Sequence, residues 1–114
     1  MPCILWHNPR CSKSRAALDL LRSRGIEPLV RDYLQDPPTR DELAAVAAAL
    51  DAPLSAMLRP SESEFAKLGL ASADDAARLD AMAAHPQLIE RPLLICDGRA
   101  VIGRPPERLL ELLG

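Results

Sequence analysis

The segment RPLLICDGRAVIG (residues 91–103) restricts the possible folds more than any other part of the chain. Two apolar runs flank the dipeptide Asp97-Gly98. Asp-Gly between two apolar runs is typical of a β-hairpin, because the dipeptide suits a tight turn between antiparallel strands. The segment therefore predicts two antiparallel strands near the C-terminus, and any fold for this chain must contain a sheet that includes them.

A second sheet-forming unit is expected at the N-terminus. Residues 3–7 form a short apolar run closed by the sequence HNPR, and residues 28–33 are expected to form another strand. Between them the pattern is helical from Ser12 to Arg24, with Gly25 as the C-terminal stop. The expected inward face of this helix consists of Ala16, Ala17, Leu20 and Leu21. A strand, a helix and a strand in this order predict a parallel pair with a right-handed crossover.

The middle of the chain is expected to be a helical insertion at about residues 39–86. Pro37-Pro38 breaks the chain before it. Three hydroxyl residues stand three positions before an acidic residue, which is the spacing of a helix-capping box. These pairs are Thr39 with Glu42, Ser61 with Glu64, and Ser72 with Asp75. The helices that follow are expected to end near Leu50, Gly69 and Ala84.

The C-terminal residues complete an α/β fold. Pro105-Pro106 favours a helix start, and the sequence PERLLELL predicts a helix with four inward leucines. These are Leu109, Leu110, Leu112 and Leu113. The full order is β-α-β, helices, then β-β-α. We therefore expect one domain over residues 1–114, with a thioredoxin-like four-stranded mixed sheet and a helical insertion between its two halves. This order places the loop after the first strand at the reactive edge of the sheet.

The composition agrees with one soluble domain. Of 114 residues, 48% are hydrophobic and 26% are charged, which is usual for a globular protein. No apolar run approaches the roughly 18 residues of a membrane helix, and the N-terminus lacks the pattern of a signal peptide. The cytoplasm is therefore the expected location, without membrane association. A net charge of −2 disfavours general nucleic-acid binding.

The three cysteines differ in their surroundings. Their odd number and wide spacing do not suggest a disulfide scaffold, and no Cys/His spacing suggests zinc, so no metal site is expected. Cys3 and Cys96 lie in the apolar runs CILW and LLIC, which predicts that both are buried in the core. Cys11 lies in the polar stretch HNPRCSKSR and is the candidate nucleophile.

Cys11 is expected to stand at the N-terminus of the helix that begins at Ser12. Unpaired backbone N–H groups and the helix dipole favour its thiolate there, but the dipole contributes at most about 2 kcal/mol. Nearby cations must therefore supply the rest. The candidates are His7, Arg10, Lys13 and Arg15. His7 either stabilises the thiolate, carries protons, or only bonds a backbone carbonyl.

Ser14 makes this a one-thiol site. It occupies the position of the resolving cysteine in a dithiol oxidoreductase, because the motif is C-x-x-S. Cys11 therefore cannot close a local disulfide, and resolution requires a separate thiol unless Cys3 or Cys96 reaches it. Ser14 is either an ordinary helix-start residue or a donor to an anion held on the sulfur.

Five segments resemble, in order and across nearly the whole chain, the glutaredoxin-coupled bacterial arsenate reductases. They are HNPRCSKSR, YLQDPPTRDEL, MLRPSE, HPQLIERPLLI and IGRPPE. The resemblance implies a thioredoxin-like fold with a helical insertion, and a catalytic cysteine at Cys11 that attacks arsenate to form a thiol-bound arsenic adduct. Glutathione, as a co-substrate, then attacks the adduct, and a glutaredoxin completes reduction to arsenite. No tightly bound cofactor is implied.

The resemblance also assigns the residues around the thiol. Three arginines, Arg59, Arg91 and Arg104, correspond to those that hold the oxyanion, and His7 corresponds to the histidine that tunes the cysteine. Pro92 stands where thioredoxin-like proteins carry a cis-proline beside the active site. The chemistry agrees, because guanidinium forks suit a multiply charged tetrahedral oxyanion.

Two other functions remain open from the sequence. One is a glutathione-dependent thiol-disulfide oxidoreductase, which would use the same cysteine on another acceptor. The other is a redox-sensing transcriptional regulator that binds RNA polymerase, which this family also resembles. Such regulators typically carry a C-x-x-C switch in this loop, and Ser14 in place of the second cysteine argues against that function.

Overall fold

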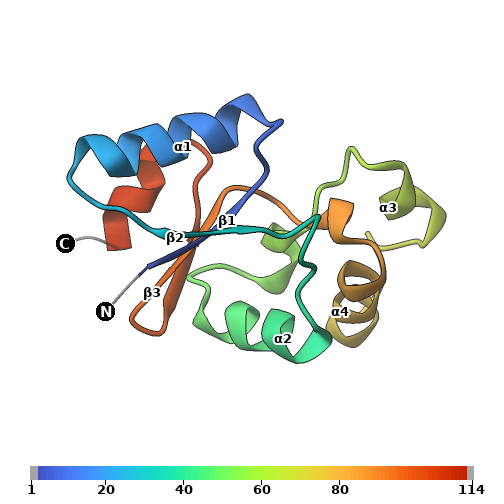
Figure 1. The fold of residues 1–114 in the computed structure, drawn as a ribbon. Helices are drawn as coiled ribbons and strands as arrows, with labels where there is room; N and C mark the ends of the chain where they lie inside the picture. Colours follow the sequence, from blue (N-terminus) through green and yellow to red (C-terminus); the bar gives the residue numbers. More distant parts are fainter. Residues whose placement is uncertain (1–2, 113–114) are drawn as a thin grey trace.

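The computed structural model describes residues 3–112 (Figure 1). Its four strands form one mixed sheet in the order β2-β1-β3-β4. The strands are β1 (Ile4–His7), β2 (Leu29–Asp32), β3 (Leu93–Cys96) and β4 (Arg99–Ile102). β1 and β2 are parallel, whereas β1 and β3, like β3 and β4, are antiparallel. The mixed sheet predicted from the order of the elements is therefore confirmed.

Asp97 and Gly98 form the turn between β3 and β4, as predicted. Their φ angles are 50° and 75°, and positive φ at both central residues characterises a type I′ turn. The backbone twist of this turn matches that of antiparallel strands. Leu93 consequently pairs with Ile102 across the hairpin.

The first helix, α1 (Ser12–Ser23), begins directly after Cys11 and ends close to the predicted boundary. Gly25 follows it with a φ of 76°, a left-handed conformation that glycine adopts easily at a helix end. The predicted C-terminal stop is therefore confirmed. The crossover from β1 through α1 to β2 joins two parallel strands.

The predicted inward face of α1 is partly wrong. Ala17 and Leu21 are fully buried and Leu20 is half-buried, but Ala16 is exposed. Ser14 is the remaining buried residue of the helix. Residues three and four apart share one helix face, so Ser14, Ala17 and Leu21 form a row from which Ala16 is excluded. A polar residue therefore occupies a core position at the first turn.

The C-terminal helix is a 3-10 helix, η3 (Pro106–Leu112). Leu109 is fully buried, as predicted, whereas Leu110 and Leu112 are half-buried. Leu113 lies outside the described residues. η3 packs beside α1 and against the sheet, which gives the sheet two helices on this face.

Helical segments fill the chain between β2 and β3, as predicted. They are α2 (Arg40–Ala49), η1 (Leu54–Met57), α3 (Ser63–Lys67), α4 (Asp75–Ala84) and η2 (Pro86–Leu88). Figure 1 shows α2 and α4 on the side of the sheet opposite α1. Within residues 3–112, no helix combines the length and the apolarity needed to cross a membrane.

The capping box predicted for α2 is present. The Thr39 hydroxyl accepts a hydrogen bond from the Glu42 N–H at 3.1 Å, and the Glu42 carboxylate accepts one from the Thr39 N–H at 3.0 Å. Two backbone donors that the first turn leaves unpaired are satisfied in this way. The helix therefore begins at the residue after Thr39.

The other two predicted boxes are wrong. α3 follows Glu62 rather than Ser61, and Glu62 makes no side-chain cap. α4 is capped by Asp74 rather than Ser72, since the Asp74 carboxylate accepts the N–H of Ala77 at 2.8 Å. A charged acceptor directly before the helix binds N-terminal N–H groups more strongly than a hydroxyl two residues further away. The spacing rule alone did not distinguish these candidates.

Each face of the sheet has its own core, because side chains alternate along the strands. The α1 face carries Leu5, Leu94, Val101 and Leu109. The face toward the helical insertion carries Trp6, Leu93, Ile102, Leu43 and Met82. The sheet therefore lies between two apolar layers, and its strand ends are the places where polar side chains can gather.

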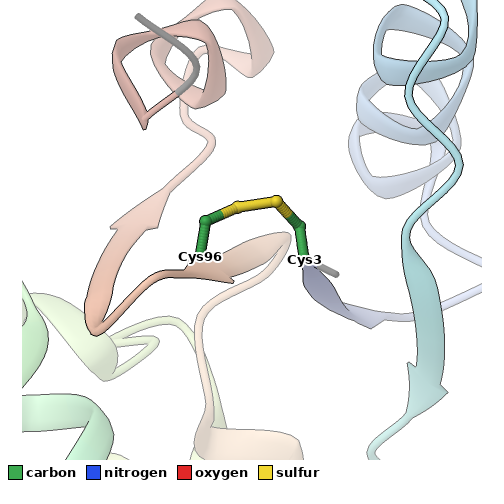
Figure 2. Close-up of a disulfide and its surroundings, with 2 residues drawn as sticks. All are labelled: Cys3 and Cys96. Carbon is green, nitrogen blue, oxygen red and sulfur yellow. A yellow bond between two sulfur atoms is a disulfide. The ribbon is translucent and has the colours of Figure 1, made fainter. Parts of the chain in front are cut away.

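Cys3 and Cys96 form a disulfide that the wide spacing of the cysteines did not suggest (Figure 2). The predicted burial is confirmed for Cys96, whereas Cys3 is half-buried. Their Cα atoms lie 4.5 Å apart. Ile4 pairs with Ile95 across β1 and β3, so the next residues along each strand, Cys3 and Cys96, also lie opposite one another. Strand β1 separates this disulfide from the loop that carries Cys11, so neither cysteine is placed to resolve it.

Candidate active site

Cys11 is the residue directly before α1, at the end of a tight loop after β1. The loop turns at Asn8, whose carbonyl accepts the Cys11 N–H at 3.0 Å and whose side-chain oxygen accepts the Arg10 N–H at 3.0 Å. Cys11 has an extended backbone, with φ of −95° and ψ of 122°. Its thiol is free and half-buried. The expected placement at a helix N-terminus is thus what the structure shows.

The surroundings of Cys11 favour its thiolate. Burial alone raises the pKa of the Cys11 thiol. The backbone N–H of Ser14, the charge of Arg91 and the backbone N–H of Lys13 each lower this pKa, and their combined effect is larger than that of burial. The pKa therefore lies below its ordinary value. The thiolate is thus stabilised by N–H groups of the first helical turn and by a guanidinium that lies 80 positions away in the sequence.

The adjacent cations contribute less than the sequence suggested. Lys13 acts through its backbone N–H rather than its charge. The Arg15 guanidinium donates to the Pro9 carbonyl at 2.8 Å, which supports the loop, and Arg10 is exposed. The positive charge that acts on Cys11 therefore comes from the other end of the chain.

His7 contacts Ser14. Its Nδ1 atom lies 2.6 Å from the Ser14 hydroxyl, and the same hydroxyl accepts the Asn8 N–H at 3.0 Å. His7 is 6% exposed and Ser14 is fully buried. Burial lowers the pKa of His7, and Arg22 and Arg15 lower it further, whereas Asp32 raises it. The contact joins the end of β1 to the first turn of α1.

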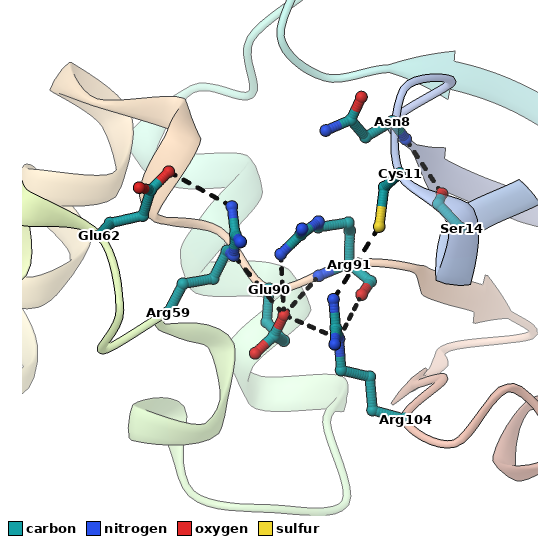
Figure 3. A network of polar contacts seen from close by, with 8 residues as sticks. All are labelled: Asn8, Cys11, Ser14, Arg59, Glu62, Glu90, Arg91 and Arg104. Carbon is teal, nitrogen blue, oxygen red and sulfur yellow. Dashed lines mark hydrogen bonds and ion pairs between the residues drawn. The ribbon is translucent and has the colours of Figure 1, made fainter.

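The three predicted arginines surround the Glu90 carboxylate, and two of them, Arg91 and Arg104, also lie next to the thiol (Figure 3). Arg104 Nη2 lies 4.0 Å from Cys11 Sγ, and Arg104 Nε donates to the Arg91 carbonyl at 2.9 Å. Arg91 and Arg104 come from the loops before β3 and after β4, where both precede cis-prolines, Pro92 and Pro105. The cis-proline that the resemblance implied at Pro92 is therefore present.

Arg91 is a buried cation with an unused donor. The residue is 9% exposed, and its Nε atom is the only buried side-chain nitrogen or oxygen within residues 3–112 that lacks a hydrogen-bond partner. A buried N–H group of a charged side chain without a partner costs at least about 1–3 kcal/mol. Such groups are rare in folded proteins unless they serve a ligand. Arg91 therefore keeps one donor, Nε, that is not used within the described part of the chain.

Glu90 is the site residue that sequence reasoning missed. Its Oε1 atom lies 3.0 Å from Arg104 Nε, 3.4 Å from Arg91 Nη1 and 3.9 Å from Arg59 Nε. The same atom accepts the Arg91 backbone N–H at 3.2 Å. Its position directly before Arg91 was visible in the sequence, but neighbouring residues often point in different directions. One carboxylate oxygen therefore faces all three arginines.

A cavity of about 210 Å³ opens beside this cluster. Glu90 and Arg104 form part of its wall, together with Asp51, Ile102 and Arg108. The wall carries charges of both signs as well as apolar side chains. A co-substrate or a displaced side chain has room there, next to the arginine that approaches the thiol.

The arrangement of the sheet and the site defines the class of protein. A free cysteine with a lowered pKa stands at the first helix N-terminus of a thioredoxin-like sheet, and a cis-proline precedes the adjacent strand. No second cysteine lies in that turn, because Ser14 fills the position. This is a thioredoxin-like protein with one free thiol in the described part of its chain.

Comparisons with known proteins identify the family. A profile of the ArsC family matches residues 6–112. An arsenate reductase of Neisseria meningitidis is 44% identical over 96% of each chain, and YfgD, an uncharacterized protein of Escherichia coli, is 41% identical over 96% of this chain and 95% of its own. The structure of an arsenate reductase from Vibrio cholerae has a TM-score of 0.92, with 44% identity over 97% of each chain. The chain belongs to the ArsC family.

Proposed function

We propose that this protein is an arsenate reductase in which Cys11 is the nucleophile. The observation that carries the proposal is the unpaired Nε of buried Arg91, in a cluster of three guanidinium groups that extends to within 4.0 Å of a thiol with a lowered pKa. Relatives that bear the name arsenate reductase are 39–44% identical to this chain. The reaction requires an anion pocket and a thiolate, and the cluster of three guanidinium groups and the lowered pKa of Cys11 support the assignment of these roles.

Arg59, Arg91 and Arg104 would bind the oxyanion. Guanidinium groups offer planar forks of N–H donors that match the oxygens of a tetrahedral anion. The backbone N–H groups that face Cys11 would hold an oxygen of the anion next to the sulfur. The anion would then lie within bonding distance of the thiolate, where attack on the central atom is possible.

The first step forms a bond between Cys11 Sγ and arsenic, and one arsenate oxygen leaves as water. This step leaves arsenic as As(V). Reduction to As(III) needs two electrons, which the oxidation of two thiols to one disulfide supplies. Ser14 offers no thiol, and the Cys3–Cys96 disulfide is at the far end of β1. At least one of the two thiols must therefore come from outside the chain, and both do if Cys11 stays bonded to arsenic during the reduction.

Glutathione and a glutaredoxin would supply these thiols. Glutathione would attack the arsenic adduct and form a second arsenic–sulfur bond, while another oxygen leaves as water. The glutaredoxin thiol would then attack the glutathione sulfur and form a mixed disulfide with it, and the electron pair of the broken arsenic–sulfur bond would stay on arsenic as As(III). Hydrolysis of the remaining arsenic–sulfur bond would release arsenite and regenerate Cys11. The proposal places the enzyme in the cytoplasm, where the glutathione pool is kept reduced.

The test is an arsenite-formation assay with arsenate, glutathione and glutaredoxin, run beside a glutathione mixed-disulfide substrate. We expect arsenite only when all components are present. The variant Arg91→Ala should raise the KM for arsenate about tenfold or more, because a buried charge-assisted contact is lost. Arg99→Ala, an exposed arginine on β4, is the matched control and should not change it. Turnover of the mixed disulfide without any arsenite would overturn the proposal and favour a thiol-disulfide oxidoreductase.

A further inference from the structure

We propose that Glu90 sets the oxyanion affinity of the site, as an internal counter-ion that an incoming anion must displace from the arginines. This inference rests on the proposed function, because it assumes that the oxyanion binds at Arg59, Arg91 and Arg104. These three residues are called the arginine cluster below. Glu90 is neither a nucleophile nor a proton carrier in this account. It is a residue that sets the affinity for oxyanions.

The contacts of Glu90 resemble those expected of a bound anion. One oxygen, Oε1, lies 3.0 Å from Arg104 Nε, 3.4 Å from Arg91 Nη1 and 3.9 Å from Arg59 Nε. The backbone fixes this placement, because the Glu90 N–H donates to the Met57 carbonyl at 2.6 Å. The free enzyme therefore already holds a carboxylate among the groups that would bind its substrate (Figure 3).

The charges at the site are nearly balanced without a ligand. The arginine cluster carries three positive charges, and the Cys11 thiolate, Glu90 and Glu62 carry three negative ones. Glu62 pairs with Arg59 alone, at 3.3 Å, and is about a third exposed. Water screens Glu62 more than it screens Glu90, whose side chain is 19% exposed. Glu90 therefore contributes the inner negative charge that a multiply charged oxyanion meets.

The carboxylate satisfies the cluster only in part. Arg91 Nε has no partner although Arg91 Nη1 and its backbone N–H both face Glu90. Arg104 Nε donates its single hydrogen to the Arg91 carbonyl, although Glu90 Oε1 lies only 3.0 Å from the same nitrogen. A tetrahedral anion offers more oxygens than one carboxylate and would satisfy these donors better. Glu90 also lines the adjoining cavity of about 210 Å³, which gives its side chain space to withdraw.

The negative charge of Glu90 is therefore expected to weaken the binding of every oxyanion at the arginine cluster. Glu90→Gln keeps the size of the side chain and one carbonyl oxygen for the arginines, but removes the competing charge. One unit charge within a few ångströms, in a partly solvated site, changes anion affinity by about tenfold. The variant should therefore bind arsenate and inorganic phosphate about tenfold more tightly than the wild type.

The experiment measures binding without turnover. Inorganic phosphate or arsenate is titrated against alkylation of Cys11 by iodoacetamide, in the absence of glutathione, and the half-protecting concentration is recorded. Glu90→Gln should lower this concentration about tenfold, whereas Glu90→Asp, which keeps the charge, should leave it near the wild-type value. Glu62→Gln should lower it less than Glu90→Gln does. Glu27→Gln, in an exposed ion pair with Arg22, should leave it unchanged.

A second readout separates charge competition from a structural role. Without any anion, the pH midpoint of Cys11 alkylation should fall in Glu90→Gln, because a neighbouring negative charge that opposes the thiolate is gone. Unchanged or weaker protection in a folded Glu90→Gln protein would overturn the inference and show that Glu90 positions the arginines. Improved protection in this variant, with no arsenite formed in the assay above, would support the inference while the proposed reaction fails.

Discussion

The two ends of strand β1 carry the same functional group in opposite chemical states. At one end, Cys11 is a free thiol among backbone N–H groups and the charge of Arg91, which lower its pKa. At the other end, Cys3 and Cys96 form a disulfide, and Cys96 is 5% exposed among apolar side chains. The contrast shows that the surroundings of a cysteine, rather than its proximity to cations in the sequence, decide whether it is reactive.

The two regions are nevertheless connected through the sheet. β1 and β3 run antiparallel, so the end of β1 that leads into the Cys11 loop lies beside the start of β3, which follows Arg91. The disulfide joins the opposite ends of the same two strands. The disulfide therefore links β1 and β3 at the ends of the strands away from the site. The other ends of the same two strands bring the Cys11 thiol and the Arg91 guanidinium together.

The largest expected effect tests the division of roles between the cysteines. Cys11→Ser should reduce arsenite formation by at least about a thousandfold, because a hydroxyl at this position is a far weaker nucleophile than a thiolate. The double variant Cys3→Ser and Cys96→Ser should keep most of the activity at a temperature where it is folded. The measurement is the initial rate of arsenite formation for each purified protein.

Either of two results would contradict the division of roles between Cys11 and the Cys3–Cys96 disulfide. Substantial turnover by the Cys11→Ser protein would mean that another group attacks the substrate. A folded Cys3→Ser and Cys96→Ser protein without activity would mean that the disulfide takes part in the redox cycle. Circular dichroism on each variant shows whether it is folded.

The second prediction concerns stability. The Cys3–Cys96 disulfide joins residues 93 positions apart, and a cross-link over a loop of this length restricts the unfolded chain strongly. Its reduction should lower the free energy of unfolding by about 3–5 kcal/mol. Urea unfolding with and without dithiothreitol measures this difference, in a Cys11→Ser background that prevents thiol exchange.

The control is the triple variant in which all three cysteines are serine. Dithiothreitol should not change its unfolding curve. Coincident curves for the Cys11→Ser protein with and without reductant would show that the disulfide does not stabilise the fold. The two ends of β1 would then differ in accessibility alone, and the structural role assigned to the disulfide would be lost.

Much of the fold could be predicted because its strongest signals are local. The Asp97-Gly98 turn and the strand-helix-strand order at the N-terminus depend on residues close together in the sequence. The Cys3–Cys96 pair could not be found in this way. It follows from the register between β1 and β3, where Ile4 meets Ile95, and no local pattern states which strands become neighbours.

The residues of the candidate site also fall into those that the sequence revealed and those that it did not. Cys11 was found from its own loop, and the three arginines from a resemblance that spans the chain. Glu90 was missed because its role depends on where its carboxylate points. The carboxylate faces three arginine side chains, and the sequence does not give its orientation. Ser14 was weighed as a helix-start residue or an anion donor, whereas its hydroxyl contacts His7. Side-chain orientation, rather than residue type, is what the sequence did not reveal.

The smallest expected effect concerns Ser14 and pH. The pKa of Cys11 is lowered, so the thiolate fraction at neutral pH is higher than for an ordinary cysteine and the alkylation midpoint is expected below that of an ordinary cysteine. Ser14→Ala keeps the backbone N–H but removes the hydroxyl that His7 and the Asn8 N–H hold. A looser first turn should raise the midpoint and slow alkylation at pH 7 a few-fold.

Ser12→Ala is the matched control, because Ser12 is an exposed residue of the same turn. Its alkylation profile should follow that of the wild type. If Ser14→Ala and Ser12→Ala both match the wild type, the buried His7–Ser14 contact does not act on the thiol. The lowered pKa of Cys11 would then depend on Arg91 and on backbone N–H groups that keep their positions without the His7–Ser14 contact. If only Ser14→Ala shifts, reactivity at this end of β1 depends on a polar contact buried in the first turn of α1.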